Sequence, residues 1–379
     1  MNLHHIDMIE WLGLDFKLPI TDPTWIFFLV LVIILFAPLL LSKLRIPHVI
    51  GLILAGLLVG EHGFNLLERD SSFELFGKVG IYYIMFLAGL EMDMGNFARY
   101  GKRGSVFGLL TFIIPFVIGL AIGVHVLHYS LLTSMLLACI FSSHTLVSYP
   151  IVGRYGVEKH ESVVYSIVAT AIASFAALLI LAGIVGAQEH ETGVWFWVGF
   201  VLKFVLYGLF VILCFPYIGR KFFRRYNDNV MQYIFVLAMV FFSAALAELA
   251  GLEGLLGAFL AGLVLNRLIP KVSPLMNRIE FVGNALFIPY FLIGVGMIIN
   301  IELLFTGAET LWVVLIMVLT ATITKWLPAF TMQKLFGMNG SSRRMMFGLT
   351  NAHAAGALAM VMIGTQIEIA PGEYLMSDV

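Results

Sequence analysis

Residues 51–60 read GLILAGLLVG, and residues 257–266 repeat their pattern of small residues as GAFLAGLVLN, an offset of 206. Residues 86–92, FLAGLEM, match residues 291–297, FLIGVGM, at an offset of 205. A third match, at an offset of 209, is centred on two histidines described below. Three matches at nearly one spacing indicate two structural repeats within the chain.

The composition indicates a membrane protein. Apolar residues make up 60% of the chain and charged residues only 12%, whereas a soluble domain is about half apolar and a quarter charged. In a membrane protein, internal repeats are typical of a secondary transporter whose site lies between them. The chain has neither a phosphate-binding loop nor a nucleophile elbow. We therefore expect no enzymatic activity, no cofactor and no nucleic-acid partner.

Twelve stretches are long and apolar enough to cross a bilayer, which takes roughly 20 residues per helix. The second and ninth are short and rich in glycine, and they occupy corresponding places in the two repeats. The sequence predicts an all-α integral membrane protein with spans at 24–42, 46–60, 78–95, 104–126, 129–152, 161–187, 194–218, 230–250, 253–266, 280–300, 310–333 and 344–366.

Basic residues predict the orientation of these spans. Of the 22 Lys and Arg residues, 17 fall in alternate connections on one side, which the positive-inside rule assigns to the cytoplasm. We therefore expect a multi-pass protein of the cell membrane, in bacteria the inner membrane, with its N-terminus outside. The 17 residues are Lys43, Arg45, Arg99, Lys102, Arg103, Arg154, Lys159, Arg220, Lys221, Arg224, Arg225, Arg267, Lys271, Arg278, Lys334, Arg343 and Arg344.

The repeats predict four segments along the chain. Residues 1–23 form an external N-terminal segment, and 24–187 form repeat 1 with six transmembrane helices. A linker helix occupies 188–229, and 230–379 form repeat 2 with five helices. The sixth span would pair with a helix beyond residue 379, so a thirteenth span is expected but missing. Either the chain is a shortened form or its final span has been removed, and we favour the second interpretation. A regulatory domain is expected after it.

The fifth span contains an unusually polar stretch, SSHTLVSYP, at residues 142–150. Proline disrupts the helix before it, and irregular backbone at membrane depth is tolerated inside protein or beside a water-filled cavity. One interpretation is an unwound cation site built from carbonyls and hydroxyls. The other is ordinary Ser and Thr packing between helices. A matching polar break at residues 350–353, TNAH, favours the cation site.

Two lysines lie inside predicted spans. Lys325 is about nine residues from the inner end of the eleventh span, and therefore roughly 13 Å deep. A buried ammonium is costly unless it is paired or neutral, so it usually marks a functional site. The alternative is a structural cation satisfied by carbonyls at helix ends. Lys203 is comparably deep in the seventh span, where a packing or lipid-facing role is the simpler interpretation.

Five segments resemble, in order, the second group of monovalent cation/proton antiporters, which includes sodium/proton exchangers and glutathione-gated potassium efflux proteins. The resemblance covers nearly the whole chain. It implies an inverted-repeat antiporter fold of thirteen spans, a homodimer, and two discontinuous helices that cross at mid-membrane and match the fifth and twelfth spans. The segments are IPHVIGLILAG, FLAGLEMD, SSHTLVSYPIVGRYGV, LLGAFLAGLVLNRLIP and GNALFIPYFLIGVGM.

The chain departs from that family at the sixth span, where members carry one or two acidic residues facing the crossing. Here Ser174 falls at the aspartate position and Ala173 beside it, while the family lysine falls on Lys325. Serine coordinates a cation only as a neutral oxygen and does not titrate near neutral pH. The candidate cation/proton site comprises Ser142, Ser143, His144, Thr145, Thr170, Ser174, Lys325, Asn351 and His353, with no metal beyond the transported cation.

The resemblance implies exchange of a monovalent cation, Na⁺ or K⁺, for protons by alternating access. The missing aspartate makes inactivity or altered coupling a specific alternative. His144 and His353 could serve as proton carriers in its place, because histidine titrates near neutrality. A rival hypothesis is a transport-silent membrane sensor or scaffold derived from an antiporter. A weaker one is uptake of an organic anion, which only the positive charge of Lys325 supports.

Overall fold

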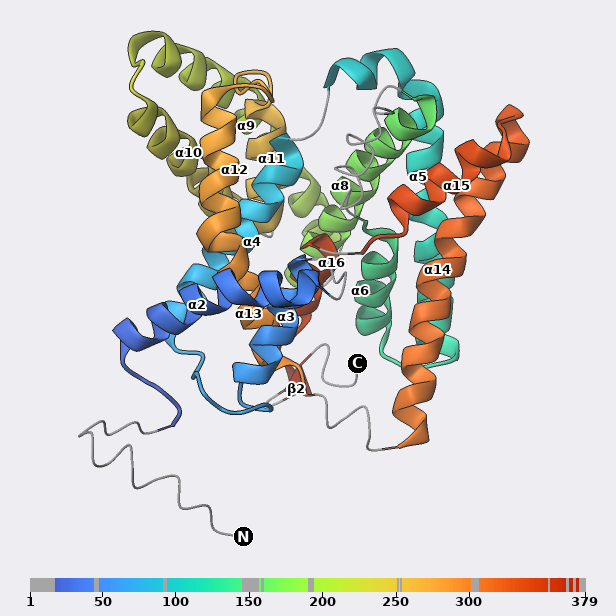
Figure 1. Ribbon diagram of the computed structural model, residues 1–379. Coiled ribbons are helices and arrows are strands. Elements are labelled where there is room, and N and C mark those ends of the chain that lie inside the picture. Colours follow the sequence, from blue (N-terminus) through green and yellow to red (C-terminus); the bar gives the residue numbers. More distant parts are fainter. Residues whose placement is uncertain are drawn as a thin grey trace, which may run out of the picture. The chain divides into compact units, whose positions relative to one another are not determined.

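The structure is a computed structural model of the chain. The part of the chain that the structure describes is helical apart from one small sheet, and each predicted span overlaps a helix (Figure 1). The described residues are 18–43, 48–90, 94–144, 157, 160–189, 194–250, 252, 254–300, 307–353, 355–365, 368–370 and 373–374.

The chain forms two compact units, one made of Met1–Gly80 and Val282–Thr310 and the other of Ile81–Phe281 and Leu311–Val379. In the first unit, α3 (His48–Val59) packs against α13 (Ile288–Ile298) and against α2 (Pro23–Ser42). The π-helical turn η1 (Gly283–Phe287) leads directly into α13.

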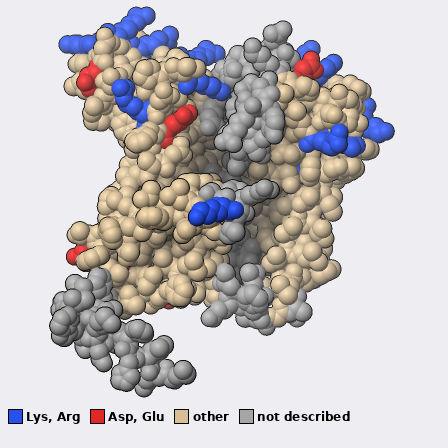
Figure 2. Space-filling model, in the orientation of Figure 1, with Lys and Arg blue, Asp and Glu red and all other residues tan. Residues whose placement is uncertain are grey.

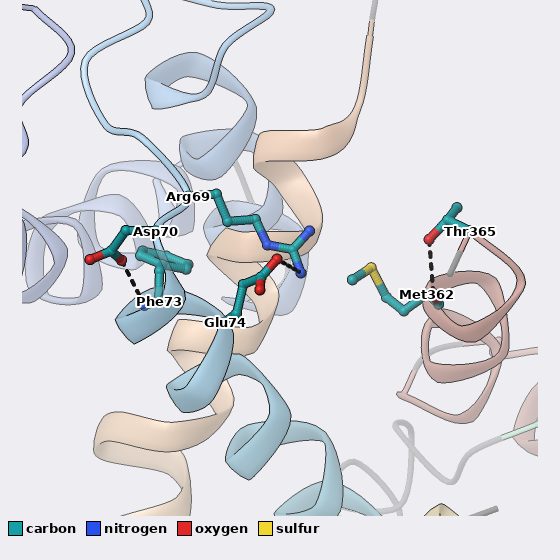
Figure 3. Close-up of polar contacts among 6 residues, drawn as sticks. All are labelled: Arg69, Asp70, Phe73, Glu74, Met362 and Thr365. Carbon is teal, nitrogen blue, oxygen red and sulfur yellow. Dashed lines mark hydrogen bonds and ion pairs between the residues drawn. The ribbon is translucent and has the colours of Figure 1, made fainter. Parts of the chain in front are cut away.

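Helix α4 (Ser71–Leu90) begins in the first unit and continues into the second. Asp70 fixes its start by accepting a hydrogen bond from the Phe73 amide at 2.8 Å, and Arg69 lies 3.8 Å from the Glu74 carboxylate (Figure 3). The helix therefore begins seven residues before the predicted apolar span, because an N-cap rather than hydropathy sets a helix start. Likewise, α12 (Pro274–Val282) precedes the predicted start of the tenth span.

In the second unit, α5 (Met94–His125) packs closely against α6 (Leu131–Ser142) and α8 (Glu161–Glu189). A buried cluster joins α5 and α8 to α14 (Ala308–Phe336) and α15 (Gly340–Thr350). Helix α16 (Ala355–Gly364) packs against α6 and ends in a turn where the Thr365 hydroxyl donates to the Met362 carbonyl (Figure 3). The cluster consists of Phe107, Tyr165, Ala169, Ala329, Met332 and Met346.

The same unit contains α9 (Val194–Arg225), α10 (Asn229–Leu249) and α11 (Gly254–Leu265), with α11 against both of the others. A buried hydroxyl pair links them, because Tyr207 lies 2.7 Å from the Ser243 hydroxyl, which donates to the Gly257 carbonyl. The short strands β1 (Glu368–Ala370) and β2 (Glu373–Tyr374) pair antiparallel, an addition that the sequence did not predict.

Glycines from the matched segments lie at close helix crossings. A Cβ on Gly56 would overlap the Ile293 carbonyl, and one on Gly296 would overlap that of Ile53. In the second unit, a Cβ on Gly262 would overlap the Phe86 carbonyl and one on Gly89 that of Phe259. Each repeat therefore supplies a Gly-rich helix that crosses a helix of the other. Gly89 of α4 and Gly296 of α13 occupy corresponding places in the two crossings and are 207 residues apart. The sequence match between residues 86–92 and 291–297 has an offset of 205, which differs by two residues.

The helix surfaces are strongly apolar. Among the described residues, eight helices are long and apolar enough to span a membrane, and α3, α6 and α11 are shorter apolar helices. Figure 2 shows Lys and Arg gathered in patches, while most of the other described surface in view carries no charge. A basic patch at the end of α9 comprises Arg220, Lys221, Arg224 and Arg225, all exposed.

Candidate functional site

The site begins where α6 ends. Ser142 is its last residue, and Ser143 turns to an extended conformation with φ −67° and ψ 142°. The Ser142 hydroxyl donates to the carbonyls of Ala138 at 2.7 Å and Phe112 at 3.1 Å, which ties the helix end to α5. The last carbonyls of a helix lack intrahelical donors and carry the negative end of its dipole. This end therefore attracts a cation.

A second break lies between α15 and α16, at the position the sequence indicated. Helix α15 ends at Thr350, whose hydroxyl donates to the Met346 carbonyl, and α16 begins at Ala355. Gly356 in the first turn of α16 is buried, and a Cβ there would lie 2.8 Å from the Ser143 hydroxyl. The α16 backbone therefore approaches the broken end of α6 closely.

Lys325 of α14 is fully buried and reaches the end of α6. Its ammonium donates to the Ser142 carbonyl at 2.6 Å and the Thr111 carbonyl at 3.0 Å, and it lies 3.3 Å from His144 Nδ1. An ammonium has three N–H donors, and two carbonyl oxygens and one imidazole nitrogen lie within reach of them here. The cation is thus paired within the protein, as a charge at membrane depth must be.

His144 Nδ1 lies 3.3 Å from the Lys325 ammonium and 3.4 Å from the Ser142 carbonyl oxygen. A protonated lysine requires Nδ1 to accept, whereas the carbonyl requires it to donate, so a neutral His144 makes only one of these two hydrogen bonds at a time. His144 is 1% exposed, and within the described part of the chain its Nε2 has no hydrogen-bond partner. The same holds for both ring nitrogens of His353 and for the Thr111 hydroxyl. Lys325 and His353 both lie close enough to His144 to interact with it electrostatically.

The described hydrogen bonds do not link the other predicted site residues to Lys325. Thr170 is buried in α8 and donates within that helix to the Ser166 carbonyl at 2.8 Å. Ser174 lies half-buried four residues further along α8, and Asn351 half-buried at the C-terminal end of α15. Thr145 lies outside the described residues. The described hydrogen bonds therefore join Lys325 with Ser142 and His144, but do not extend to Thr170 or Ser174.

Sequence reasoning missed Thr111, which contributes a backbone carbonyl rather than a side chain to Lys325. A signal was present, because Pro115 lies four residues later in the same helix. Proline has no amide hydrogen and so leaves the carbonyl four residues earlier without its helical donor. A proline in a membrane helix thus identifies one backbone acceptor that another group must satisfy.

The site is built from neutral acceptors. Among the described residues, the partners of the Lys325 ammonium are two carbonyls and an imidazole, with no carboxylate. Carbonyl and hydroxyl oxygens suit hard monovalent cations, and imidazoles suit proton transfer. The arrangement can therefore hold a positive charge at a helix break and offers unpartnered imidazole nitrogens beside it.

Comparison with known proteins gives consistent matches. The family model described as "Sodium/hydrogen exchanger, transmembrane" matches residues 31–376. The Na(+)/H(+) antiporter NhaS5 of Synechocystis is 35% identical over 97% of this chain, and the chain spans only 52% of that relative's length. The Probable Na(+)/H(+) antiporter 3 of Methanocaldococcus jannaschii is 27% identical, over 94% of this chain and 92% of the relative.

Solved structures show the same fold. The sodium proton antiporter MjNhaP1 from Methanocaldococcus jannaschii matches with a TM-score of 0.68 in an electron-microscopy structure, covering 96% of this chain and 86% of that one. A structure of the same protein at pH 8 matches with a TM-score of 0.65, over 89% and 85% of the two chains. Sequence identity is 16% in both comparisons. From the family match over most of its length, we conclude that this chain belongs to the sodium/hydrogen exchanger family.

Proposed function

We propose that this chain exchanges a monovalent cation, Na⁺ or K⁺, for protons across a membrane by alternating access. The observation that carries the proposal is the buried Lys325 ammonium, bonded to the Ser142 carbonyl at the broken end of α6. Two further facts support it. The chain belongs to the sodium/hydrogen exchanger family, and the relatives named above are Na⁺/H⁺ antiporters or probable ones.

In this proposal, the oxygens at the two helix breaks form the cation region. The hydroxyls of Ser142, Ser143, Thr145, Thr170 and Ser174 coordinate as neutral oxygens, and Asn351 lines the region from repeat 2. Lys325, His144 and His353 are the groups that gain and lose protons. Their placement supports this assignment, because His144 contacts Lys325 directly and His353 lies near enough to interact with it electrostatically.

The absence of a carboxylate among the described partners of Lys325 favours a second candidate, a transport-silent sensor or scaffold. A carboxylate binds a cation when ionised and releases it when protonated, so one group couples the two fluxes. Ser174, at the position where the family carries that acid, cannot do this. If neither the histidines nor Lys325 takes over the coupling function of the missing carboxylate, the protein keeps the fold but does not exchange cations for protons.

Purified protein in liposomes separates the two candidates. A pH gradient is imposed, Na⁺, K⁺ or Li⁺ is added outside, and the internal pH is followed by fluorescence. Exchange predicts a cation-dependent proton flux from the wild-type protein. A silent protein gives no flux, and in that case Ser174→Asp should create one whereas the matched Ser174→Asn should not. Absence of flux from folded wild-type protein would overturn the exchange proposal, and flux restored by Ser174→Asp would then favour the silent protein.

We also propose a homodimer in the bacterial inner membrane with the N-terminus outside. The distribution of Lys and Arg supports this orientation. A regulatory domain following residue 379 is proposed from the Synechocystis relative, of which this chain spans about half.

A further inference from the structure

Helix α5 contains a proline in its interior at position 115. Because proline lacks the amide hydrogen, the Thr111 carbonyl has no donor within its own helix. Thr111 is fully buried, and a buried backbone carbonyl without a donor is costly, most of all in a membrane. A donor from outside the helix is therefore required.

Lys325 supplies that donor. Its ammonium lies 3.0 Å from the Thr111 carbonyl and 2.6 Å from the Ser142 carbonyl. The two acceptors are left free for different reasons, one by a proline inside α5 and the other by the end of α6. Both carbonyls accept from the same ammonium, so the positive charge of Lys325 lies between α5 and α6, at a point where each helix lacks one internal hydrogen bond.

We propose that Pro115 and Thr111 are positioning residues. Pro115 provides no amide hydrogen for the Thr111 carbonyl, and this carbonyl instead accepts from the Lys325 ammonium and fixes it at the end of α6. The proposal does not require that the protein transports, because it concerns how the charge is held. Pro216 in α9 serves as a matched control, because it also lies inside a long apolar helix. Ile212, four positions before it, is 52% exposed, and α9 contributes no residue to the Lys325 contacts described above.

A double-mutant cycle tests the proposal by thermal unfolding in detergent. Lys325→Met removes the donor and leaves the Thr111 carbonyl unpaired, and Pro115→Ala restores a helical amide for it. Pro115→Ala should therefore raise the unfolding midpoint more in the Lys325→Met background than in the wild type, where it competes with the ammonium. We expect a difference of about 2 °C or more, the size of one hydrogen bond.

Pro216→Ala serves as the control and should shift the midpoint equally in both backgrounds. Equal shifts for Pro115→Ala in both backgrounds would overturn the proposal. If Lys325→Met does not yield folded protein, Lys325→Gln replaces it in the cycle. The glutamine amide keeps two weaker donors, so the difference should have the same sign and a smaller size, and its absence would equally overturn the proposal.

A second readout distinguishes positioning from mere stability. If the protein transports, Pro115→Ala should move the alkaline limb of its pH profile to lower pH by about one unit, because an ammonium with one acceptor fewer loses its proton more readily. Among the residues that the structure describes, the other titratable groups that face Lys325 are His144 and His353, and neither is changed. Pro216→Ala should leave the limb in place, and an unmoved limb in Pro115→Ala would contradict positioning.

Discussion

At the scale of single residues, Lys325 is a buried cation held by neutral acceptors from α5 and α6. Hydrogen bonds to an ionised donor contribute about 1.5–3 kcal/mol each, so the two to the Ser142 and Thr111 carbonyls offset part of the cost of burying the ammonium. His144 lies beside the ammonium, with Nδ1 3.3 Å from Lys325 Nζ, while Nε2 is without a partner in the described structure.

Whether His144 accepts from Lys325 can be tested by two substitutions, only one of which keeps an acceptor near the position of Nδ1. His144→Asn places an amide oxygen near the position of Nδ1, whereas His144→Ala removes the acceptor. We expect His144→Ala to lower the thermal midpoint in detergent by about 2–4 °C and His144→Asn to lower it much less. Equal losses in the two variants would show that packing, not the hydrogen bond to Lys325, explains the effect.

The residue-level site could be predicted only in part. Lys325, His144 and His353 were identifiable because ionisable side chains are rare in apolar spans. Thr111 was not, because its contribution is a carbonyl that every residue carries and only Pro115 distinguishes it. The functional roles of all these residues remain predictions, and that of Ser174 rests on the resemblance alone, without a contact in the structure.

At the scale of elements, crossings of Gly-rich helices bring backbones together in each unit. Gly56 and Gly296 lie at the crossing of α3 and α13, and Gly262 and Gly89 at that of α11 and α4. Small residues let helices approach closely where lipid gives no hydrophobic drive for association. The helices themselves were predictable from hydropathy, but the starts of α4 and α12 were not, because the capping residues Asp70 and Ser273 set them.

A methyl group at a crossing should be far more costly than one on an open helix face. Gly56→Ala would push a Cβ into the Ile293 carbonyl, and we expect it to destabilise the protein by about 1–3 kcal/mol. Gly208→Ala in α9 meets nothing within 4 Å and should stabilise by about 0.5–1 kcal/mol through helix propensity. Thermal midpoints in detergent measure both. A Gly56→Ala protein as stable as Gly208→Ala would contradict the crossing.

At the scale of the whole molecule, the apolar helices indicate a membrane protein, and the alternation of basic residues predicts its orientation. The apolar helices were predictable from hydropathy, although only eight of the described ones are long enough to span a membrane, and the repeats were predictable from matching segments. The offset between the repeats was predicted less well. The sequence match at residues 86–92 gave an offset of 205, whereas the glycines at the two helix crossings, Gly89 and Gly296, are 207 residues apart. Side-chain similarity alone did not reveal which backbone positions are in contact.

Cysteine labelling tests the orientation. Cys139 and Cys214 are first replaced by alanine, and then His62→Cys and Arg225→Cys are made at two exposed positions. A membrane-impermeant thiol reagent applied to intact bacterial cells should label the protein with cysteine at 62 and not that with cysteine at 225. Permeabilised cells serve as the control, in which both should label. The reverse pattern in intact cells would place the N-terminus inside.

The most direct test of the account compares two lysines that both lie inside predicted spans. Lys325 is fully buried at the helix break, whereas Lys203 is exposed on α9. In liposomes with an imposed pH gradient, Lys325→Met should reduce the cation-dependent proton flux about tenfold or more, and Lys203→Met should leave it within about twofold. Undiminished flux from Lys325→Met, in a folded protein, would contradict the assignment of the exchange site to the broken end of α6.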